Sequence, residues 1–345
     1  MGVQISEILP KREIDYAFLK KKVLAVDAHL TLYQFLTTIR QQDGSLLTDA
    51  DGSVTSHLMG IITRNANLLS REIFPVYVFD GKPPELKMKT LEERKRSKLE
   101  AQKMYEEARE LGLVEEMKKY ASRTARLTPE MIEESKELLR AMGIPVVNAP
   151  SEGEAQAAYI VKKGDAFAAA SQDADCLLFG TPRLVRNLNI TSKKKIPGTL
   201  AYKQVPIELI ELEEVLSTLG LCRDQLIALA MLVGTDFNPG GIRGIGPKNA
   251  LKLVKKHGEN FDALFNSVGW RNFFEFDWKE VFELIKNMPT TDDYNIRMGR
   301  ISREKVLEIL CEKHQFSRER VEKLLSQIEE TSENNAQKGL SEFFR

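Results

Sequence analysis

Short apolar runs alternate with amphipathic segments over the first half of the chain. A strand is predicted in each apolar run, at residues 23–26, 75–80, 144–150 and 166–171. Helices are predicted between them: after residue 27, over residues 55–72 and 128–142, and from residue 151 onward. This alternation predicts an α/β fold with a largely parallel, twisted central sheet flanked by helices.

The chain changes character outside these segments. Residues 84–126 are dominated by Lys, Arg, Glu and Ala, which predicts an exposed, mobile helical excursion. Beyond residue 206 the pattern is mostly helical, and residues 329–339 are polar enough to predict disorder. We therefore expect one large domain over residues 1–328 and a flexible tail over residues 329–345, which ends in the apolar stretch LSEFFR.

The composition is that of an ordinary globular chain. Of 345 residues, 42% are hydrophobic and 29% are charged, and the formal net charge is zero, so only local clusters of charge can indicate a nucleic-acid partner. Cys176, Cys222 and Cys311 lie far apart without a CxxC pair, and neither disulfides nor a zinc site are expected. The N-terminal segment lacks a signal-peptide core and no apolar run is long enough to span a membrane, which predicts a reducing, intracellular location.

Acidic residues follow the predicted strands at their carboxyl ends. Asp27 and Asp80 end two apolar runs, and Asp173 and Asp175 follow a third. In extended backbone, residues two apart point the same way, so Asp173 and Asp175 are expected to share a face. With one pair at a helix start and one residue after an apolar helix, the candidates are Asp27, Asp80, Glu152, Glu154, Asp173, Asp175 and Asp236. Ligands bind outside the carboxyl edge of open α/β sheets, and these seven carboxylates are expected to gather there.

Such a cluster of carboxylates needs a cation. Like charges in one cleft repel one another and raise one another's pKa values unless a cation neutralises them. Ligands that are all oxygen suit Mg²⁺ or Mn²⁺, and Mg²⁺ commonly meets substrate phosphate. Two such ions about 3.5–4 Å apart clamp the attacking and leaving oxygens in a phosphodiester displacement. The pattern therefore predicts a two-metal site.

Each acid has a simpler explanation when it is taken alone. Asp27 suits an N-cap, and Ser151 with Glu154 fits a capping box. Asp80 before Gly81, and Asp236 near Asn-Pro-Gly, suit turns. For any one residue the structural role ties with or outweighs the metal role. Four apolar segments that end in the same chemistry favour the metal site.

Basic residues are concentrated in three stretches. Residues 240–257 and 183–203 contain several Lys and Arg and no acid, and residues 82–98 contain seven basic residues against three glutamates. Such clusters are typical of phosphate binding, although a solvated surface is the usual explanation of one run. In GIRGIGPKNALKLV, a glycine turn leads into a helix that begins at Pro247, which predicts a backbone grip on DNA phosphate more than mere packing.

Three further side chains are candidates on spacing. Lys87 and Arg94 lie seven residues apart, so they share a face if this segment is helical, and they could stabilise charge on a phosphate. Ordinary surface cations are the explanation that spacing alone favours. Tyr33 could stack on a base, but the pattern alone favours a core-facing position.

Five motifs together resemble the flap endonucleases of the structure-specific 5′ nuclease family. They are VDAHLTLYQF, YVFDGKPPELK, APSEGEAQAA, SQDADCLLFG and LVGTDFNPGGIRGIGPKNA, and they occur in order along nearly the whole chain. The resemblance implies a PIN-like core and a Mg²⁺-dependent hydrolase that cuts 5′ flaps at junctions of single- and double-stranded DNA, with some 5′→3′ exonuclease activity. Okazaki-fragment maturation and long-patch base-excision repair are the processes it implies.

The resemblance also assigns roles to regions and residues. It implies an N-terminal nuclease region over 1–98, a threading arch over 84–126, an internal nuclease region over 116–258, and a helix–two-turn–helix element over 240–257 that binds duplex DNA through K⁺. The seven carboxylates match the ligands of two Mg²⁺ ions, for which Mn²⁺ may substitute. Residues matching those near the scissile phosphate are Lys87, Arg94, Tyr33 and Gly2. Expected DNA contacts are Glu152, Lys193, Lys194, Gly234, Asp236, Arg243, Gly244, Gly246, Lys248 and Lys252.

The end of the chain resembles the box that binds a sliding clamp. Its residues are Gln337, Leu340, Phe343 and Phe344, and a flexible tail with apolar anchors suits docking into a groove. The chain ends one residue later, which favours an archaeal, nucleoid-associated protein, with a nuclear location only for a eukaryotic one. His29 departs from the motif and is expected to be a packed or polar neighbour of the site. A monomer is expected.

Two other functions fit part of the pattern. A nuclease of the same superfamily that acts on bubbles or four-way junctions would keep the chemistry, but the arch and the clamp box favour free 5′ ends. A non-catalytic DNA-binding adaptor for the clamp would gain nothing from seven carboxylates placed near phosphates.

Overall fold

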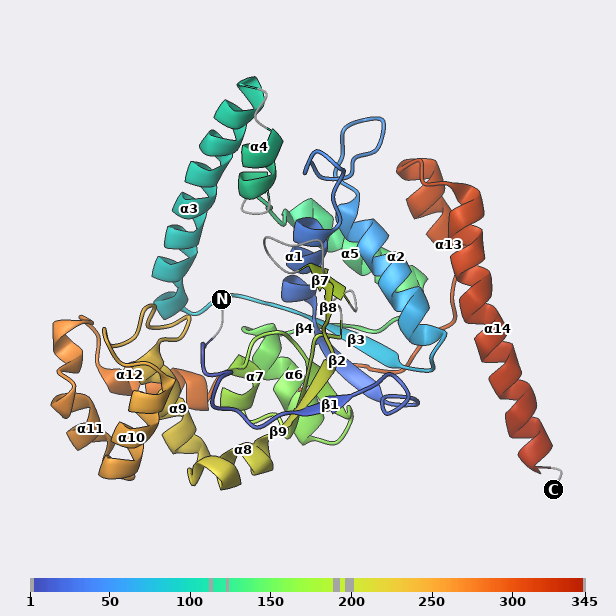
Figure 1. The fold of residues 1–345 in the computed structure, drawn as a ribbon. Coiled ribbons are helices and arrows are strands. Elements are labelled where there is room, and N and C mark those ends of the chain that lie inside the picture. Colours follow the sequence, from blue (N-terminus) through green and yellow to red (C-terminus); the bar gives the residue numbers. More distant parts are fainter. Residues whose placement is uncertain (1–2, 112–113, 122–123, 189–192, 196–201, 344–345) are drawn as a thin grey trace.

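The computed structural model describes residues 3–343 except for 112–113, 122–123, 189–192 and 196–201, and it does not describe the side chains of 109, 114, 117–119, 193–195, 202–204 and 331–343. A seven-stranded sheet forms the centre of the molecule (Figure 1), with strand order β1-β9-β6-β5-β2-β3-β4. Its strands are β1 (Arg12–Ile14), β2 (Val23–Asp27), β3 (Phe74–Phe79), β4 (Val146–Asn148), β5 (Ala168–Ala170), β6 (Arg183–Arg186) and β9 (Ile207–Glu211). Neighbouring strands from β4 to β6 pair in parallel, and only β9 pairs antiparallel, with β6 and β1. The predicted α/β fold with a largely parallel sheet is confirmed.

Both faces of the sheet are buried along its central strands β2, β3 and β5, which is why these strands read as nearly continuous apolar runs. Successive residues of β2 point to opposite faces, so Ala25 joins one hydrophobic cluster while Leu24 and Val26 join the other. The first cluster lies under α6 (Gly153–Lys162), α7 (Asp175–Leu178), α8 (Leu212–Leu219), α9 (Arg223–Val233), α10 (Pro247–His257), α11 (Phe261–Ser267) and α12 (Trp278–Lys286). The second lies under α1 (Ala28–Thr38), α2 (Ser56–Leu69), α5 (Pro129–Ala141), α13 (Arg303–Leu307) and α14 (Arg318–Phe343).

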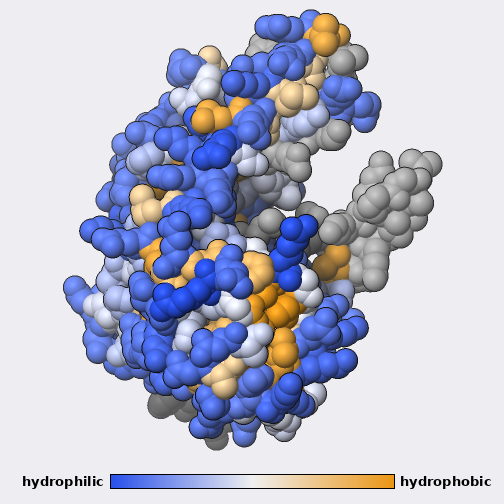
Figure 2. Space-filling view, turned by 90° about the vertical axis from the view of Figure 1, so that its left-hand side faces the viewer, coloured by the Kyte–Doolittle hydropathy of each residue, from blue (hydrophilic) through white to orange (hydrophobic). Residues whose placement is uncertain are grey.

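Two helices project from the body as an arm (Figure 1). They are α3 (Glu85–Glu110) and α4 (Val114–Ala121), which pack against each other. Hydrophilic residues cover most of the face shown in Figure 2, and hydrophobic ones appear there as separate patches. Leu111 near the tip is exposed. The helical excursion predicted for residues 84–126 is confirmed as helical, whereas its mobility stays a prediction.

Several elements differ from their predicted form. The helix predicted from Ser151 begins at Gly153, and its N-cap Glu152 makes no side-chain capping bond, so the suggested capping box does not form. The chain leaves β5 at Ala170 and turns, and Asp175 opens helix α7, so the extended geometry predicted for Asp173 and Asp175 is wrong. A short turn after Ala170 leads directly into α7, so the strand is shorter than predicted.

A second pair of strands and a helical C-terminal segment are present that the sequence pattern does not predict. A separate two-stranded ribbon pairs β7 (Lys193–Lys195) with β8 (Tyr202–Gln204). The backbone of α14 is helical through Phe343, although the sequence pattern predicts a flexible tail from residue 329. The residues from 329 onward include Glu, Gln, Ala and Lys, which are good helix formers, and no proline. The flexibility predicted for residues 329–345 stays a prediction.

The cysteines and the apolar helices agree with the sequence. Cys176, Cys222 and Cys311 are all free thiols. In the described ranges, no single helix has the length and apolar character needed to cross a membrane; α8 with α9 meets that criterion only as a pair bent by 80°.

Candidate active site

Six predicted acids lie at or just beyond the carboxyl ends of four parallel strands. Asp27 is the last residue of β2, and Asp80 directly follows β3. Glu152 and Glu154 begin α6 after β4, and Asp173 and Asp175 lie between β5 and the first turn of α7. Asp236, the seventh, comes in the turn after α9. The parallel sheet therefore brings together acids that are up to 148 residues apart in sequence, from Asp27 to Asp175.

Hydrogen bonds from several parts of the chain orient these carboxylates. The Ser171 hydroxyl lies 2.9 Å from Oε1 of Glu154 and 3.3 Å from Oδ2 of Asp27. The backbone amide of Val3 donates to Oδ1 of Asp175 at 2.7 Å. The N-terminal segment thus reaches the acids, although Gly2 itself is outside the described residues.

The polar neighbour expected of His29 is also present. The Asp80 backbone amide donates to His29 Nδ1 at 3.1 Å, and the ring packs edge-on against Phe79. Burial lowers the pKa of His29, more than Asp80 raises it. A neutral ring that accepts through Nδ1 fits this arrangement, and His29 acts as a packed neighbour of Asp80.

Burial and mutual repulsion raise the pKa values of the innermost acids. Burial, with repulsion from Asp80 and Asp173, raises the pKa of Asp27 to about 7. Burial also raises the pKa of Asp175 to about 7, opposed by the Val3 hydrogen bond. The pKa of Glu154 is raised well above its usual value by burial and then by Asp175 and Asp27. Acids that perturb one another in this way share one cleft, as a cation site requires.

Two cations from α3 lie against the outer side of the cluster. Lys87 Nζ is 2.5 Å from Oε2 of Glu152 and 3.6 Å from Oδ2 of Asp236. Arg94 Nη2 is 2.5 Å from Oδ1 of Asp236. Burial raises the pKa of Glu152, and Lys87 opposes that rise. Burial lowers the pKa of Lys87, but Glu152, Asp236 and Asp80 together outweigh it and raise that pKa above its usual range. The structure therefore brings Lys87 and Arg94 to the acids, as the family resemblance implies and as spacing alone does not.

The donor set suits a hard divalent ion. Among the residues that the structure describes, no three His, Cys, Asp or Glu side chains are arranged so that they could hold a metal ion as they stand. The available donors are carboxylate oxygens, the ligands of Mg²⁺ and Mn²⁺, and the ammonium and guanidinium groups of α3 occupy two of them. The cluster thus fits divalent ions by charge and chemistry, with the α3 cations standing where positive charge is needed.

A cavity of about 520 Å³ adjoins the acids under the arm. Arg94 and Thr90 of α3 line it on one side, and Asp236 and the turn from Gly234 to Gly240 line it on the other. Tyr33 of α1 is half-buried nearby and faces α3 through Lys98, so it is not the core-facing residue that its pattern favours. Of the seven acids, Asp236 lines this cavity.

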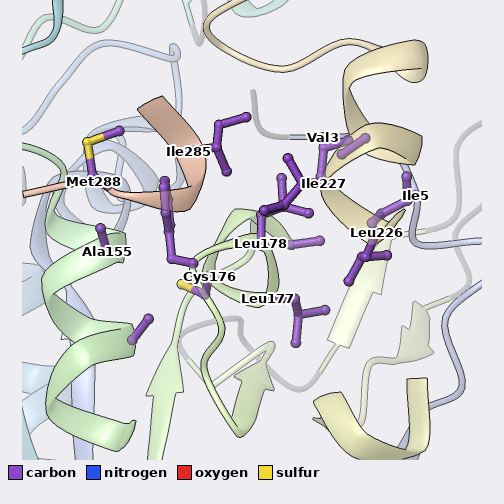
Figure 3. Close-up of a cluster of buried hydrophobic side chains, with 14 of the residues drawn as sticks. Val3, Ile5, Ala155, Cys176, Leu177, Leu178, Leu226, Ile227, Ile285 and Met288 are labelled. Atoms are coloured by element: carbon purple, nitrogen blue, oxygen red, sulfur yellow. The ribbon is translucent and has the colours of Figure 1, made fainter. Parts of the chain in front are cut away.

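A hydrophobic cluster fixes the helices that carry the acids (Figure 3). Its side chains come from the N-terminal segment, α6, α7, α9, α12 and the turn after α12: Val3, Ile5, Ala155, Cys176, Leu177, Leu178, Leu226, Ile227, Ile285 and Met288. Cys176 Sγ lies 3.7 Å from Oε1 of Glu154, at the border between this cluster and the acids. The hydrophobic cluster therefore fixes helices α6 and α7, which carry Glu154 and Asp175.

The predicted duplex-binding element forms a tight pair of turns between α9 and α10. A Cβ on Gly234, whose φ is +114°, would lie 2.7 Å from the Gly241 amide nitrogen. Gly246 is the N-cap of α10, with Pro247 at its start. The remaining candidates, Arg243, Gly244, Lys248 and Lys252, are exposed. Exposed basic side chains thus lie beside the glycine turn and the start of α10, the combination that phosphate binding uses.

Some predicted residues lie outside the described part of the chain. They are Gly2 and Phe344 entirely, and the side chains of Lys193, Lys194, Gln337, Leu340 and Phe343. Sequence reasoning also missed Val3, Ser171 and the Gly153 amide, which donates to Asp80. In a sequence, a serine directly after a strand or a glycine between two glutamates is only a weak sign of a role at a site. A backbone amide that donates a hydrogen bond, as that of Val3 does, has no sequence signature at all.

Comparison with known proteins shows which families and relatives this chain resembles. Family models match residues 1–101 (XPG N-terminal domain) and residues 143–236 (XPG I-region). Flap endonuclease 1 of Aeropyrum pernix is 54% identical over 321 residues, which cover 92% of this chain and 91% of that protein. Flap endonuclease 1 of Pyrococcus furiosus is 49% identical over 345 residues, the full length of both.

A solved structure agrees with these matches. The flap endonuclease-1 structure from Methanococcus jannaschii superposes with a TM-score of 0.76 at 37% identity, and the match covers 97% of this chain and 100% of that one. All three proteins are archaeal, and each match covers more than nine tenths of this chain.

Proposed function

This chain belongs to the flap endonuclease 1 family of structure-specific 5′ nucleases, and from that premise we propose that its seven carboxylates hold two Mg²⁺ ions for the hydrolysis of 5′ flaps. The observation that supports the metal site is the cluster itself, in which buried acids raise one another's pKa values and attract the cations of α3. The products would carry 5′-phosphate and 3′-hydroxyl ends.

Each group has a distinct task in this proposal. Bound divalent ions would activate the attacking water and stabilise the leaving oxygen. Asp27, Asp80, Glu152, Glu154, Asp173, Asp175 and Asp236 would supply the ligands. Lys87 and Arg94 would leave their carboxylate partners for the scissile phosphate, where fixed cations stabilise developing negative charge. Tyr33 would stack on the base beside that phosphate.

The flap assignment is tested by substrate choice. With Mg²⁺, a duplex carrying a 5′ flap should be cut faster than a blunt duplex, a bubble or a four-way junction of the same sequence. A preference for bubbles or junctions would assign the chain to the sibling activity. Binding of flaps without any cutting would support the non-catalytic adaptor.

The metal role is tested at a single ligand. Asp173→Ala should abolish cutting but leave flap binding in Ca²⁺ largely intact, because Asp173 would contribute to the ions and not to the duplex contact. The control is Asp293→Ala, which changes the same charge at an exposed position far along the chain. Retained cutting by Asp173→Ala would remove this residue from the site.

Duplex binding, partners and location complete the proposal. The turns around Gly244 and Gly246, with Lys248 and Lys252, would grip the duplex backbone, with K⁺ held by the turn, while Mn²⁺ would substitute for Mg²⁺ at the acids. The segment from Gln337 to Phe344 would bind a sliding clamp. The protein would act as a monomer in the archaeal cytoplasm, associated with the nucleoid, in Okazaki-fragment maturation and long-patch base-excision repair.

A further inference from the structure

Four residues on one face of α3 contact the candidate site. Lys87, Thr90, Arg94 and Lys98 follow at intervals of three, four and four, which places them in a single row along a helix. We call this row the strap face. It forms the underside of the arm, and the neighbouring Lys95 and Arg96 are exposed.

The strap face contacts three separate parts of the body: the start of α6, the turn after α9 and, through Lys98, helix α1. Lys87 binds Glu152 at the start of α6, and Arg94 binds Asp236 after α9. Thr90 donates its hydroxyl to the backbone carbonyl of Asp236 at 2.7 Å. Together these contacts close the base of the arm over the acids.

Lys98 is the outermost contact and differs from the others in its partner. Its Nζ lies 3.2 Å from the Tyr33 hydroxyl and 4.4 Å from the centre of the Tyr33 ring. A cation over an aromatic face is stabilised by about 0.5–1 kcal/mol or more, depending on its exposure. Lys98 thus attaches the strap face to α1 without using a carboxylate.

The inner contacts use oxygens that metal ions would also use. The side chains of Lys87 and Glu152 are only 13% and 8% exposed, so this pair is shielded from solvent and salt. An ion bound by Glu152 and Asp236 withdraws those carboxylates from Lys87 and Arg94. Two ligands that compete for the same groups are linked reciprocally, and each weakens the other by the same factor.

We propose that the strap face is an autoinhibitory closure of the arm: it docks on the acids and on Tyr33 when metal and DNA are absent, divalent cations release its inner end, and Lys98 positions its outer end. This inference rests on the proposed metal site. It goes beyond that site because it assigns the resting position of the arm to named contacts and makes metal binding the step that frees it.

Amide hydrogen exchange in α3 tests the closure without relying on activity. Exchange over residues 87–98 is measured in the absence of DNA, with EDTA and with saturating Ca²⁺, while calorimetry on the same samples records Ca²⁺ binding. We expect Ca²⁺ to accelerate exchange in the wild type by roughly tenfold, within the usual range of coupling between two sites. Lys98→Met should exchange faster than the wild type in EDTA and gain less from Ca²⁺.

Two variants control for charge and for folding. Lys95→Met removes the same charge from the exposed side of the helix and should behave as the wild type. Lys98→Arg retains a cation for the Tyr33 ring and should restore slow exchange in EDTA. Restoration by Arg would not follow if Lys98 merely supported the helix.

The outcomes separate the two proposals. Heat of Ca²⁺ binding with unchanged or slower exchange in α3 overturns the closure while the metal site stands. No Ca²⁺ binding overturns the metal site and the closure with it. Equal exchange in Lys98→Met and Lys95→Met overturns the role of Lys98.

Discussion

The Gly153 backbone amide donates a hydrogen bond to Oδ1 of Asp80 at 2.7 Å. The first residue of α6 thereby orients a carboxylate that follows β3, so the start of one helix fixes the end of a neighbouring strand. A Cβ added to Gly153 would lie 2.7 Å from that oxygen and 3.2 Å from the carbonyl oxygen of Val78. Only glycine allows this approach.

Gly153→Ala should therefore reduce kcat on a 5′-flap substrate by about 100-fold, the loss that a misplacement of about 1 Å can cause. Single-turnover cleavage in Mg²⁺ measures the effect. Gly299→Ala is the matched control, because its Cβ would make an ordinary 3.4 Å contact with Cα of Gly143. Equal rates for the two variants would show that Asp80 tolerates displacement.

Ser171 gives a second test of how the acids are held. Its hydroxyl contacts both Glu154 and Asp27 and accepts from the Asp173 amide at 3.2 Å. Ser171→Ala removes these contacts, and groups that orient metal ligands commonly contribute 10–100-fold to metal affinity. We expect Ca²⁺ affinity, measured by calorimetry, to fall by about that factor. Ser53→Ala, at an exposed position, should leave it unchanged; an unaltered affinity in Ser171→Ala would exclude the orienting role.

The central fold could be predicted from sequence because its strands are buried on both faces. The β2 and β3 strands contain uninterrupted apolar residues, a pattern that amphipathic helices do not share. The strands β1, β6 and β9 escaped prediction because REI, RLVR and IELIE are short and alternate charged with apolar residues. Their pairing depends on contacts distant in sequence, which a local pattern does not contain.

The positions of the acids were predictable, but the way they are held was not. Asp27 and Asp80 end apolar runs, and parallel strands necessarily bring such ends to one edge. The local geometry of Asp173 and Asp175 was predicted wrongly, because nothing in the sequence marks where a three-residue strand ends. Lys87 and Arg94 share the predicted face, yet only the fold shows that this face meets the acids.

Glu134 allows a test of pH dependence away from the site. Its Oε1 lies 2.7 Å from Lys313 Nζ and 3.3 Å from His314 Nε2, and its Oε2 lies 3.7 Å from His57 Nε2. The His57 ring and the Lys313 hydrogen bond lower the pKa of Glu134 from 4.5 to about 2, although burial acts in the opposite direction. A depressed carboxyl pKa stabilises the folded state above the unfolded pKa, and that stabilisation is lost as pH falls from 4.5 to about 2.

Glu134→Gln should accordingly lower Tm at pH 7 by about 1–2 degrees, the shift that about 1 kcal/mol in a partly exposed pair produces in a chain of this length. The difference from the wild type should shrink as pH falls below 4.5, which thermal unfolding at a series of pH values measures. Glu137→Gln, on the exposed side of α5, should show no such convergence. A constant difference at every pH would contradict the assigned ionisation.

The last prediction concerns the C-terminal segment. Phe343 and Phe344 are apolar residues at the end of a polar stretch, and clustered apolar side chains can anchor such a segment in a groove on a partner. The variant with both Phe343→Ala and Phe344→Ala should lose stimulation by the sliding clamp while its cleavage of flaps without the clamp survives, because these residues come more than 100 positions after the last of the acids. Cleavage rates with and without clamp measure both properties. Ser341→Ala is a control within the same segment, since it changes no apolar anchor, and stimulation that persists in the double variant would assign the clamp contact to another surface.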